Sequence, residues 1–85
     1  MKESMQVKVR FFALYREKLG RSETTVSLQE DATVATLIEV LKRQFPQLAG
    51  LSLPLIIAVN AEYVDKQFRL TDGDEVAFIP PVSGG

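Results

Sequence analysis

The chain ends in two glycines, Gly84 and Gly85, and this terminal pair is where the sequence offers chemistry. The terminal carboxylate is a poor electrophile until it is activated as an acyl-adenylate, which supplies a leaving group. A sulfur nucleophile then gives a thiocarboxylate, and an amine gives an amide. The 85 residues contain no glycine-rich phosphate loop, so we expect a separate ATP-using enzyme to carry out the activation.

The side chains themselves offer little catalytic chemistry, because the sequence contains no Cys and no His. This excludes thiol nucleophiles, disulfides, Cys/His zinc sites and imidazole bases. We therefore expect a non-catalytic carrier with no metal and no tightly bound cofactor. The acidic residues Asp72, Asp74 and Glu75 are an alternative place for a metal ion. Asp-Gly before a strand is typical of a turn, however, and calcium or magnesium needs more oxygen ligands at defined spacing, so we favour the turn.

The residues before the glycine pair suit an extended tail. Pro80 and Pro81 restrict φ and favour an extended exit from the last strand, and Val82 and Ser83 follow. The four residues after the prolines reach about 13 Å when extended. Without Cβ atoms, Gly84 and Gly85 allow close approach by another backbone or a nucleotide. The alternative is that these residues are simply a frayed chain end. The residue types and their spacing do not decide between a functional tail and a frayed end. We assign residues 1–81 to one folded domain and 82–85 to a tail.

The rest of the chain predicts one mixed sheet with a helix. Val34, Leu37, Ile38, Leu41 and Phe45 recur at helical spacing and predict a buried stripe. Thr33 is the expected N-cap, with Asp31 as its rival, and Pro46 is expected to stop the helix. A brief helical turn is expected over 14–19, capped by Gly20. Strands are expected at 6–13, 24–28, 55–59, 63–64 and 75–79, with loops between 46 and 54 and tight turns at 60–61 and 71–74.

Two apolar residues do not fit a sheet with one covered face. If the first and last strands are neighbours, Val7, Val9 and Phe11 with Val76 and Phe78 serve the core. Phe12 and Ile79 then lie on the opposite face, at the root of the tail. Exposed apolar patches commonly mark partner surfaces, which is the interpretation we favour. The alternatives are that a loop covers Phe12 or that the face assignment is shifted by one residue.

Charge and hydropathy argue against two classes of partner, nucleic acids and membranes. The net charge is −1 and basic residues are scattered, so nucleic-acid binding is not expected. The longest apolar run, at 53–59, is too short to span a bilayer. Residues 1–6 do not resemble a signal peptide, so we expect a cytoplasmic protein with translation starting at Met1 or Met5.

Four segments together resemble the small, sulfur-carrying subunit of molybdopterin synthase: VRFFALYREKLG, TVATLIEVLKRQFP, AVNAEYV and LTDGDEVAFIPPVSGG. The resemblance covers nearly the whole chain from Met5, and the last segment is its most specific part. It implies an α+β fold of the β-grasp, or ubiquitin-like, class, in which one main helix packs on one face of a mixed sheet.

The resemblance also implies a function. An E1-like adenylyltransferase uses ATP to adenylate Gly85, which becomes a thiocarboxylate. The tail, Pro80, Pro81, Val82, Ser83 and Gly84, then enters the large synthase subunit, where sulfur passes to cyclic pyranopterin monophosphate. Two small and two large subunits form a heterotetramer, and Phe12 and Ile79 fall on the surface that meets the partner. Position 79 is Ile where an aromatic is expected in many relatives.

Three other functions are compatible with the same residues. The chain can be a sulfur carrier for thiamine or another pathway, or a protein modifier whose Gly85 forms an isopeptide bond with a lysine. It can also be an interaction domain with a chance Gly-Gly ending, which predicts no adenylation.

Overall fold

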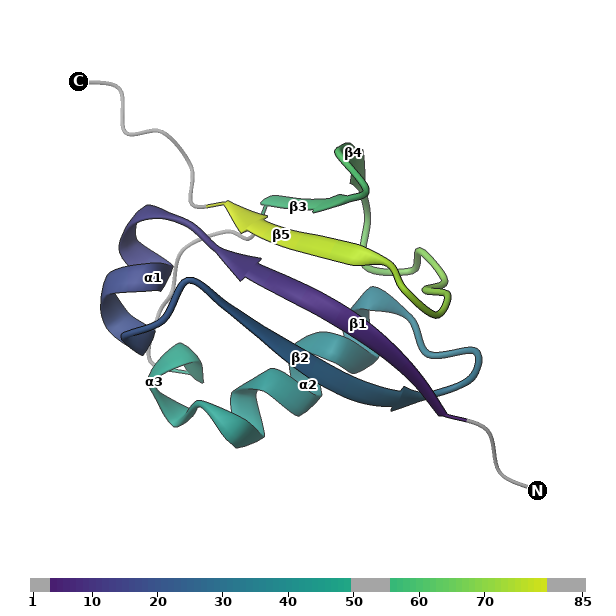
Figure 1. The fold of residues 1–85 in the computed structure, drawn as a ribbon, viewed down its shortest axis with the longest axis horizontal. Coiled ribbons are helices and arrows are strands. Elements are labelled where there is room, and N and C mark those ends of the chain that lie inside the picture. Colours follow the sequence, from purple (N-terminus) through teal and green to yellow (C-terminus); the bar gives the residue numbers. More distant parts are fainter. Residues whose placement is uncertain (1–3, 50–55, 80–85) are drawn as a thin grey trace.

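The computed structural model describes residues 4–49 and 56–79. These residues form five strands and three helices (Figure 1). In chain order the elements are β1 (Ser4–Phe11), α1 (Ala13–Leu19), β2 (Glu23–Gln29), α2 (Val34–Gln44), α3 (Pro46–Ala49), β3 (Ile56–Val59), β4 (Glu62–Val64) and β5 (Glu75–Ile79).

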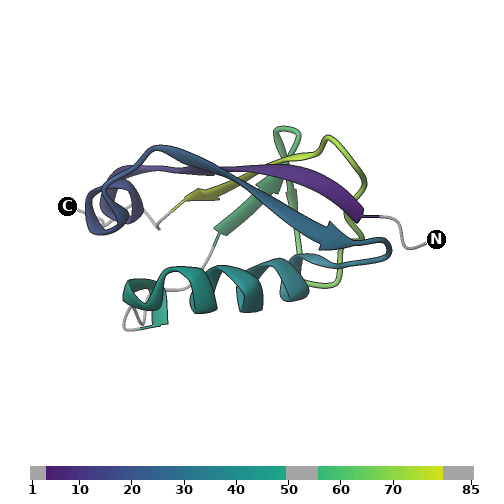
Figure 2. The same cartoon turned by 60° about the horizontal axis from the view of Figure 1, so that its bottom comes forward.

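The five strands form one mixed sheet in the order β2-β1-β5-β3-β4. The β1 and β5 strands are parallel, and every other neighbouring pair is antiparallel. Figure 2 shows α2 running beneath one face of this sheet. The prediction of a mixed sheet with one main helix on one face is therefore confirmed.

The first strand alternates strictly between exposed and buried residues. Val7 and Val9 are fully buried, and the Phe11 ring makes edge-to-face contacts with Phe78 and Phe45. The predicted strand end at residue 13 is wrong, because α1 already begins at Ala13. Phe12 is the extended residue before this helix, and its carbonyl accepts a hydrogen bond from the Tyr15 N–H. The Gly20 cap is confirmed, with a left-handed φ of 74°.

The main helix, α2, follows its predicted pattern. The Thr33 side chain accepts a hydrogen bond from the Thr36 N–H, so Thr33 is the N-cap. Four of the five predicted stripe residues are buried, and Phe45 is half-buried against the core. The helix ends at Gln44, before Pro46 as predicted. The prediction of a loop directly after Pro46 is wrong. Pro46 instead opens the short helix α3, because proline at a first helical position sacrifices no helical hydrogen bond.

Two tight turns lie between the last three strands. Asn60 and Ala61 have positive φ angles of 51° and 71°, as a tight hairpin between β3 and β4 requires. Gly73, with φ of 87°, lies in the turn before β5, and both predicted turns are confirmed. Residue 55, at the start of one predicted strand, lies outside the described residues. The division into 1–81 and 82–85 stays a prediction.

Candidate functional site

The terminal chemistry predicted for Gly85, and the tail residues Pro80, Pro81, Val82, Ser83 and Gly84, lie outside the described residues. The structure does describe the place from which this segment departs. Ile79 ends β5, which lies in the sheet between β1 and β3. A segment leaving β5 therefore starts from the middle of one end of the sheet, with strands on both sides.

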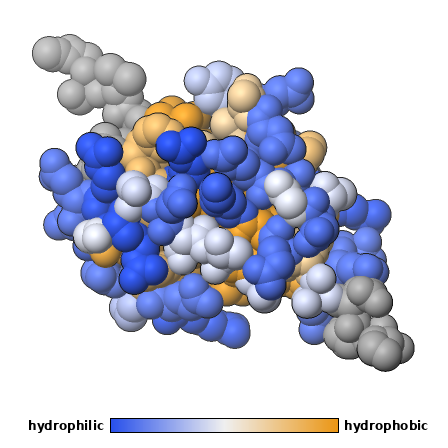
Figure 3. All heavy atoms as spheres, in the orientation of Figure 1, coloured by the Kyte–Doolittle hydropathy of each residue, from blue (hydrophilic) through white to orange (hydrophobic). Residues whose placement is uncertain are grey.

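Phe12 and Ile79 lie together beside this point, as the sequence predicted. Phe11 pairs with Phe78 in the parallel β1–β5 ladder, and the next residue of each segment lines the same hollow. Ile56 faces Ile79 from β3. Phe12 is 39% exposed, and both isoleucines are half-buried. We call these three residues the tail-root surface, and Figure 3 shows apolar colour gathering at this end of β5.

A shallow hollow continues from the tail-root surface across the open face of the sheet. The strand registers align Arg10, Ala77, Ala58 and Tyr63 in one row across β1, β5, β3 and β4. The two alanines form a low floor between the larger flanking side chains. The hollow measures ≈ 480 Å³ and also includes Phe12 and Ile79 in its lining.

Tyr63 is the residue of this face that the sequence reasoning missed. It is 77% exposed, although it is a large aromatic residue. Its isolated position in a three-residue strand carried no periodic signal. The useful signal was the two-residue turn predicted at 60–61, because a hairpin closed there pairs Val59 with Glu62 and places Ala58 opposite Tyr63.

Arg10 makes an ion pair and an aromatic contact on the open face. Its Nη1 lies 3.1 Å from Glu75 Oε2, and its guanidinium carbon lies 5.7 Å from the centre of the Phe12 ring. Both charged side chains are about half exposed, so this ion pair contributes little to stability. It does hold Arg10 over Phe12, which gives the apolar surface a polar rim.

The acidic residues of the β5 turn have separate hydrogen-bonding roles. Asp72 accepts from the Gln6 N–H at 2.8 Å. The buried Asp74 accepts from Asn60 and Thr71, and Glu75 pairs with Arg10. Within residues 4–49 and 56–79, no three metal-ligating side chains come together. These contacts support the turn over the metal alternative.

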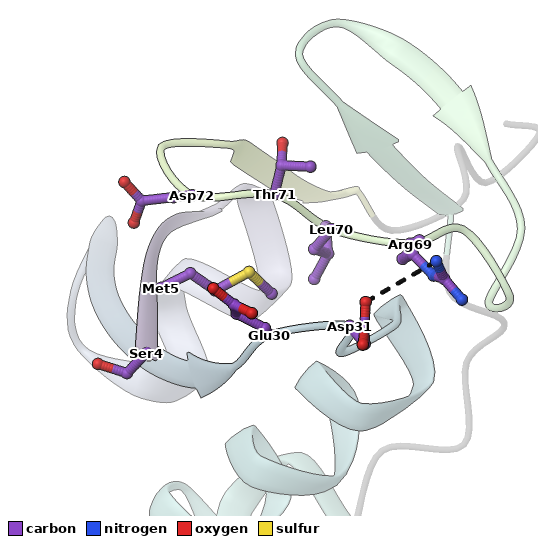
Figure 4. A pocket seen from close by; sticks show the side chains of 8 residues that line it. All are labelled: Ser4, Met5, Glu30, Asp31, Arg69, Leu70, Thr71 and Asp72. Atoms are coloured by element: carbon purple, nitrogen blue, oxygen red, sulfur yellow. Dashed lines mark ion pairs between the residues drawn. The ribbon is translucent and has the colours of Figure 1, made fainter. Parts of the chain in front are cut away.

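A second hollow lies away from the open face, near the start of β1. Figure 4 shows Asp72 and Asp31 among the side chains that line it, with Arg69 paired to Asp31 at 3.8 Å. Its volume is ≈ 390 Å³. That ion pair is largely exposed, and every charged side chain of the hollow points into solvent-accessible space, so it offers no enclosed reaction site.

Comparison with curated proteins shows similarity over nearly the whole chain. The molybdopterin synthase sulfur carrier subunit of Escherichia coli (strain K12) is 44% identical over 82 residues, covering 93% of this chain and 99% of that protein. The protein of the same name from Chlamydomonas reinhardtii is 42% identical over 83 residues, covering 95% and 100%.

Solved structures show the same architecture. SAMP1 from Haloferax volcanii has a TM-score of 0.86 at 27% identity, covering 94% of this chain and 99% of that chain. A chain from the complex of subunits 1 and 2 of the Helicobacter pylori molybdopterin-converting factor has a TM-score of 0.68 at 27% identity, covering 95% and 100%. Caldiarchaeum subterraneum ubiquitin, with a TM-score of 0.63 at 16% identity over 98% and 100% of the two chains, supports the fold alone.

These similarities confirm the predicted β-grasp fold and the family resemblance. None of the helices in the described part of the chain has the length and apolar character needed to cross a membrane. The roles predicted for Phe12 and Ile79 as partner contacts, and for Gly85 as the reactive residue, stay predictions. Residues 9–85, which make up most of the chain, match the ThiS family, and the protein therefore belongs to this family.

Proposed function

We propose that this protein is the sulfur carrier subunit of a molybdopterin synthase. The observation that carries the proposal is the 42–44% identity to two carriers of that name over at least 93% of this chain. The fold adds a physical reason. The last strand ends beside an exposed apolar surface, so a partner can hold the domain while the terminal residues reach into its active site.

The chemistry takes place on the carboxyl carbon of Gly85. Its carboxylate attacks the α-phosphorus of ATP on an E1-like adenylyltransferase, and pyrophosphate leaves. A sulfur nucleophile then displaces AMP and leaves a thiocarboxylate. In the large synthase subunit, sulfur passes to cyclic pyranopterin monophosphate and water restores the carboxylate. The product, molybdopterin, contains a dithiolene with two sulfur atoms. Each molecule of product therefore requires two loaded carriers.

The domain serves this chemistry by positioning the terminus. The tail-root surface and the hollow above Ala58 and Ala77 provide the contact with the large subunit. Two carriers and two large subunits form a heterotetramer. The adenylating enzyme supplies the ATP site, so the carrier needs no cofactor of its own. We propose that these steps take place in the cytoplasm.

Mass spectrometry of the intact protein tests the loading step. After incubation with ATP, sulfide and the cognate E1-like enzyme, the wild type gains the mass difference between one sulfur and one oxygen. A variant lacking Gly85 is the matched control and stays unchanged, because its terminal group is displaced from the adenylation site. A wild type that shows no gain, with an enzyme active on another carrier, would exclude the proposal.

SAMP1 stands for small archaeal modifier protein 1, and the likeness to it supports protein modification as a second candidate function. In that case an amine replaces sulfur as the nucleophile, and Gly85 forms an amide with a lysine of another protein. Covalent conjugates recovered from cells, absent when Gly85 is deleted, favour this function. Reconstitution of synthase activity with the pyranopterin precursor and the large subunit favours the sulfur carrier and also separates it from a carrier for thiamine.

A further inference from the structure

The outer edge of β2 is an open hydrogen-bonding edge along the sheet. Within the described part of the chain, β2 pairs only with β1, and it forms one border of the sheet in Figures 1 and 2. Its seven residues include no Lys and no Pro, and the register with β1 runs without a bulge. Natural proteins commonly use these three devices to block edge pairing. The opposite border, β4, is only three residues long.

The backbone phase of β2 determines which groups point outward. The Phe11 N–H donates to the Ser22 carbonyl at 2.9 Å, so Ser22 directs its backbone groups toward β1. Hydrogen-bonded and non-bonded positions alternate along an antiparallel ladder. Thr24 and Val26 therefore also face β1. The residues of β2 in the opposite phase are Glu23, Thr25, Ser27 and Gln29. The Gln29 carbonyl accepts from the Ala32 N–H at 3.2 Å, so the outward N–H and C=O groups open to a partner strand are those of Glu23, Thr25 and Ser27.

We propose that this edge pairs antiparallel with β2 of a second copy, centred on Thr25. In that register Thr25 lies opposite Thr25 of the second copy, and Glu23 lies opposite Ser27. The three outward-facing residues of each strand then meet one another as hydrogen-bonded pairs. Threonine pairs are favourable across strands, and no like charges are opposed.

Charge at the two ends of the edge supports a second copy as the occupant. The exposed Arg21 lies two residues before β2, whereas the exposed Glu30 and Asp31 directly follow it. Antiparallel pairing brings Arg21 of one copy toward Glu30 of the other, twice by symmetry, whereas Asp31 is already paired with Arg69 of its own chain. A hollow of ≈ 420 Å³ between this edge and α2, lined in part by Leu28, Thr36 and Val40, gives the second copy further contacts beside the backbone ladder.

The resulting dimer has a ten-stranded sheet. Its two-fold axis is perpendicular to the sheet, so the two open faces lie on the same side and the two β5 strands end at opposite ends. Pairing through β2 leaves both tail-root surfaces uncovered, because β1 separates β2 from β5. The contact is small compared with a stable interface of about 1,200 Å² or more, so we expect a dissociation constant between about 10 µM and 1 mM.

Sedimentation equilibrium over about 10 µM to 1 mM protein tests this pairing. Two variants of the same type, two residues apart on the exposed face, give opposite expectations. Thr25→Lys places two lysines against each other at the two-fold axis, which weakens the dimer by about fivefold. Ser27→Lys places each lysine opposite Glu23 of the other copy, which tightens the dimer by about threefold. Thermal unfolding checks that both variants remain folded.

Amide exchange of the wild-type protein provides a test without any substitution. The Thr25 and Ser27 N–H groups point outward, so their exchange slows as protein concentration rises, while exposed amides elsewhere do not change. A monomer throughout the concentration range overturns the proposal. A dimer that responds equally to both lysine variants, or that leaves Thr25 and Ser27 exchange unchanged, assigns the contact to another surface and also overturns it.

Discussion

Replacing Asp74 by alanine tests how the turn before β5 is held in place. Asp74 is only 8% exposed, although it is a carboxylate. Its Oδ1 accepts from Asn60 Nδ2 at 2.9 Å and from Thr71 Oγ1 at 3.1 Å, and its Oδ2 accepts from the Thr71 N–H at 2.8 Å. One side chain therefore ties the β3–β4 hairpin to the turn that starts β5.

The expected effect follows from these three contacts. A hydrogen bond to a charged group contributes about 1.5–3 kcal/mol, and bonds that share one carboxylate are not additive. The Asp74→Ala variant also leaves the Asn60 and Thr71 donors in a partly buried place. We therefore expect the free energy of unfolding to fall by about 3 kcal/mol. For a domain of this size that corresponds to a melting temperature lower by about 12–24 °C.

Urea unfolding followed by circular dichroism measures this loss, and Asp72→Ala is the matched control. Asp72 lies in the same turn and also accepts a backbone hydrogen bond, but it is exposed. Water replaces its contact with Gln6, so the control loses less than about 1 kcal/mol. Equal losses in the two variants would refute the buried network. A wild-type melting temperature that rises with Mg²⁺ or Ca²⁺, and does not rise in Asp74→Asn, would restore the metal alternative.

Three further predictions concern the surface, the core and the hairpin. Phe12→Asp weakens binding to the large synthase subunit at least about tenfold in calorimetry, as expected for a central aromatic contact. Phe68→Asp, which replaces a phenylalanine that is also 39% exposed but lies in the loop before β5, leaves that binding unchanged. Burial raises the pKa of Tyr15 above its ordinary value of 10.0. The Tyr15 hydroxyl therefore ionises first in the unfolded chain, so its contribution to stability is constant below about pH 10 and is lost as pH rises further, and thermal unfolding of Tyr15→Phe lacks this component of the alkaline decrease. Ala61→Gly relieves a left-handed residue with φ of 71° and raises the free energy of unfolding by about 0.5–1 kcal/mol in urea, whereas a decrease would contradict the turn geometry.

Local signals in the sequence predicted the individual elements well. The stripe on α2, the Thr33 cap and the alternation of β1 depend on neighbouring residues, so periodicity detects them directly. The exact ends did not follow, because Pro46 suits both the end of one helix and the start of the next. The prediction of chemistry at the terminus also needed no tertiary structure. The sequence contains no Cys and no His, and composition alone excludes reactions that need those side chains.

The sequence by itself therefore determined the elements and the kind of chemistry that is open to this protein. Tertiary structure decided which distant residues share a surface. Phe12 and Ile79 meet only because β1 and β5 are parallel neighbours, and Tyr63 joins their face only through the β3–β5 register. The buried Asp74 carboxylate accepts a hydrogen bond from Asn60, which lies in the turn between β3 and β4 and is distant in sequence. Strand order and register depend on packing across the whole chain, which the periodicity of any one segment does not contain.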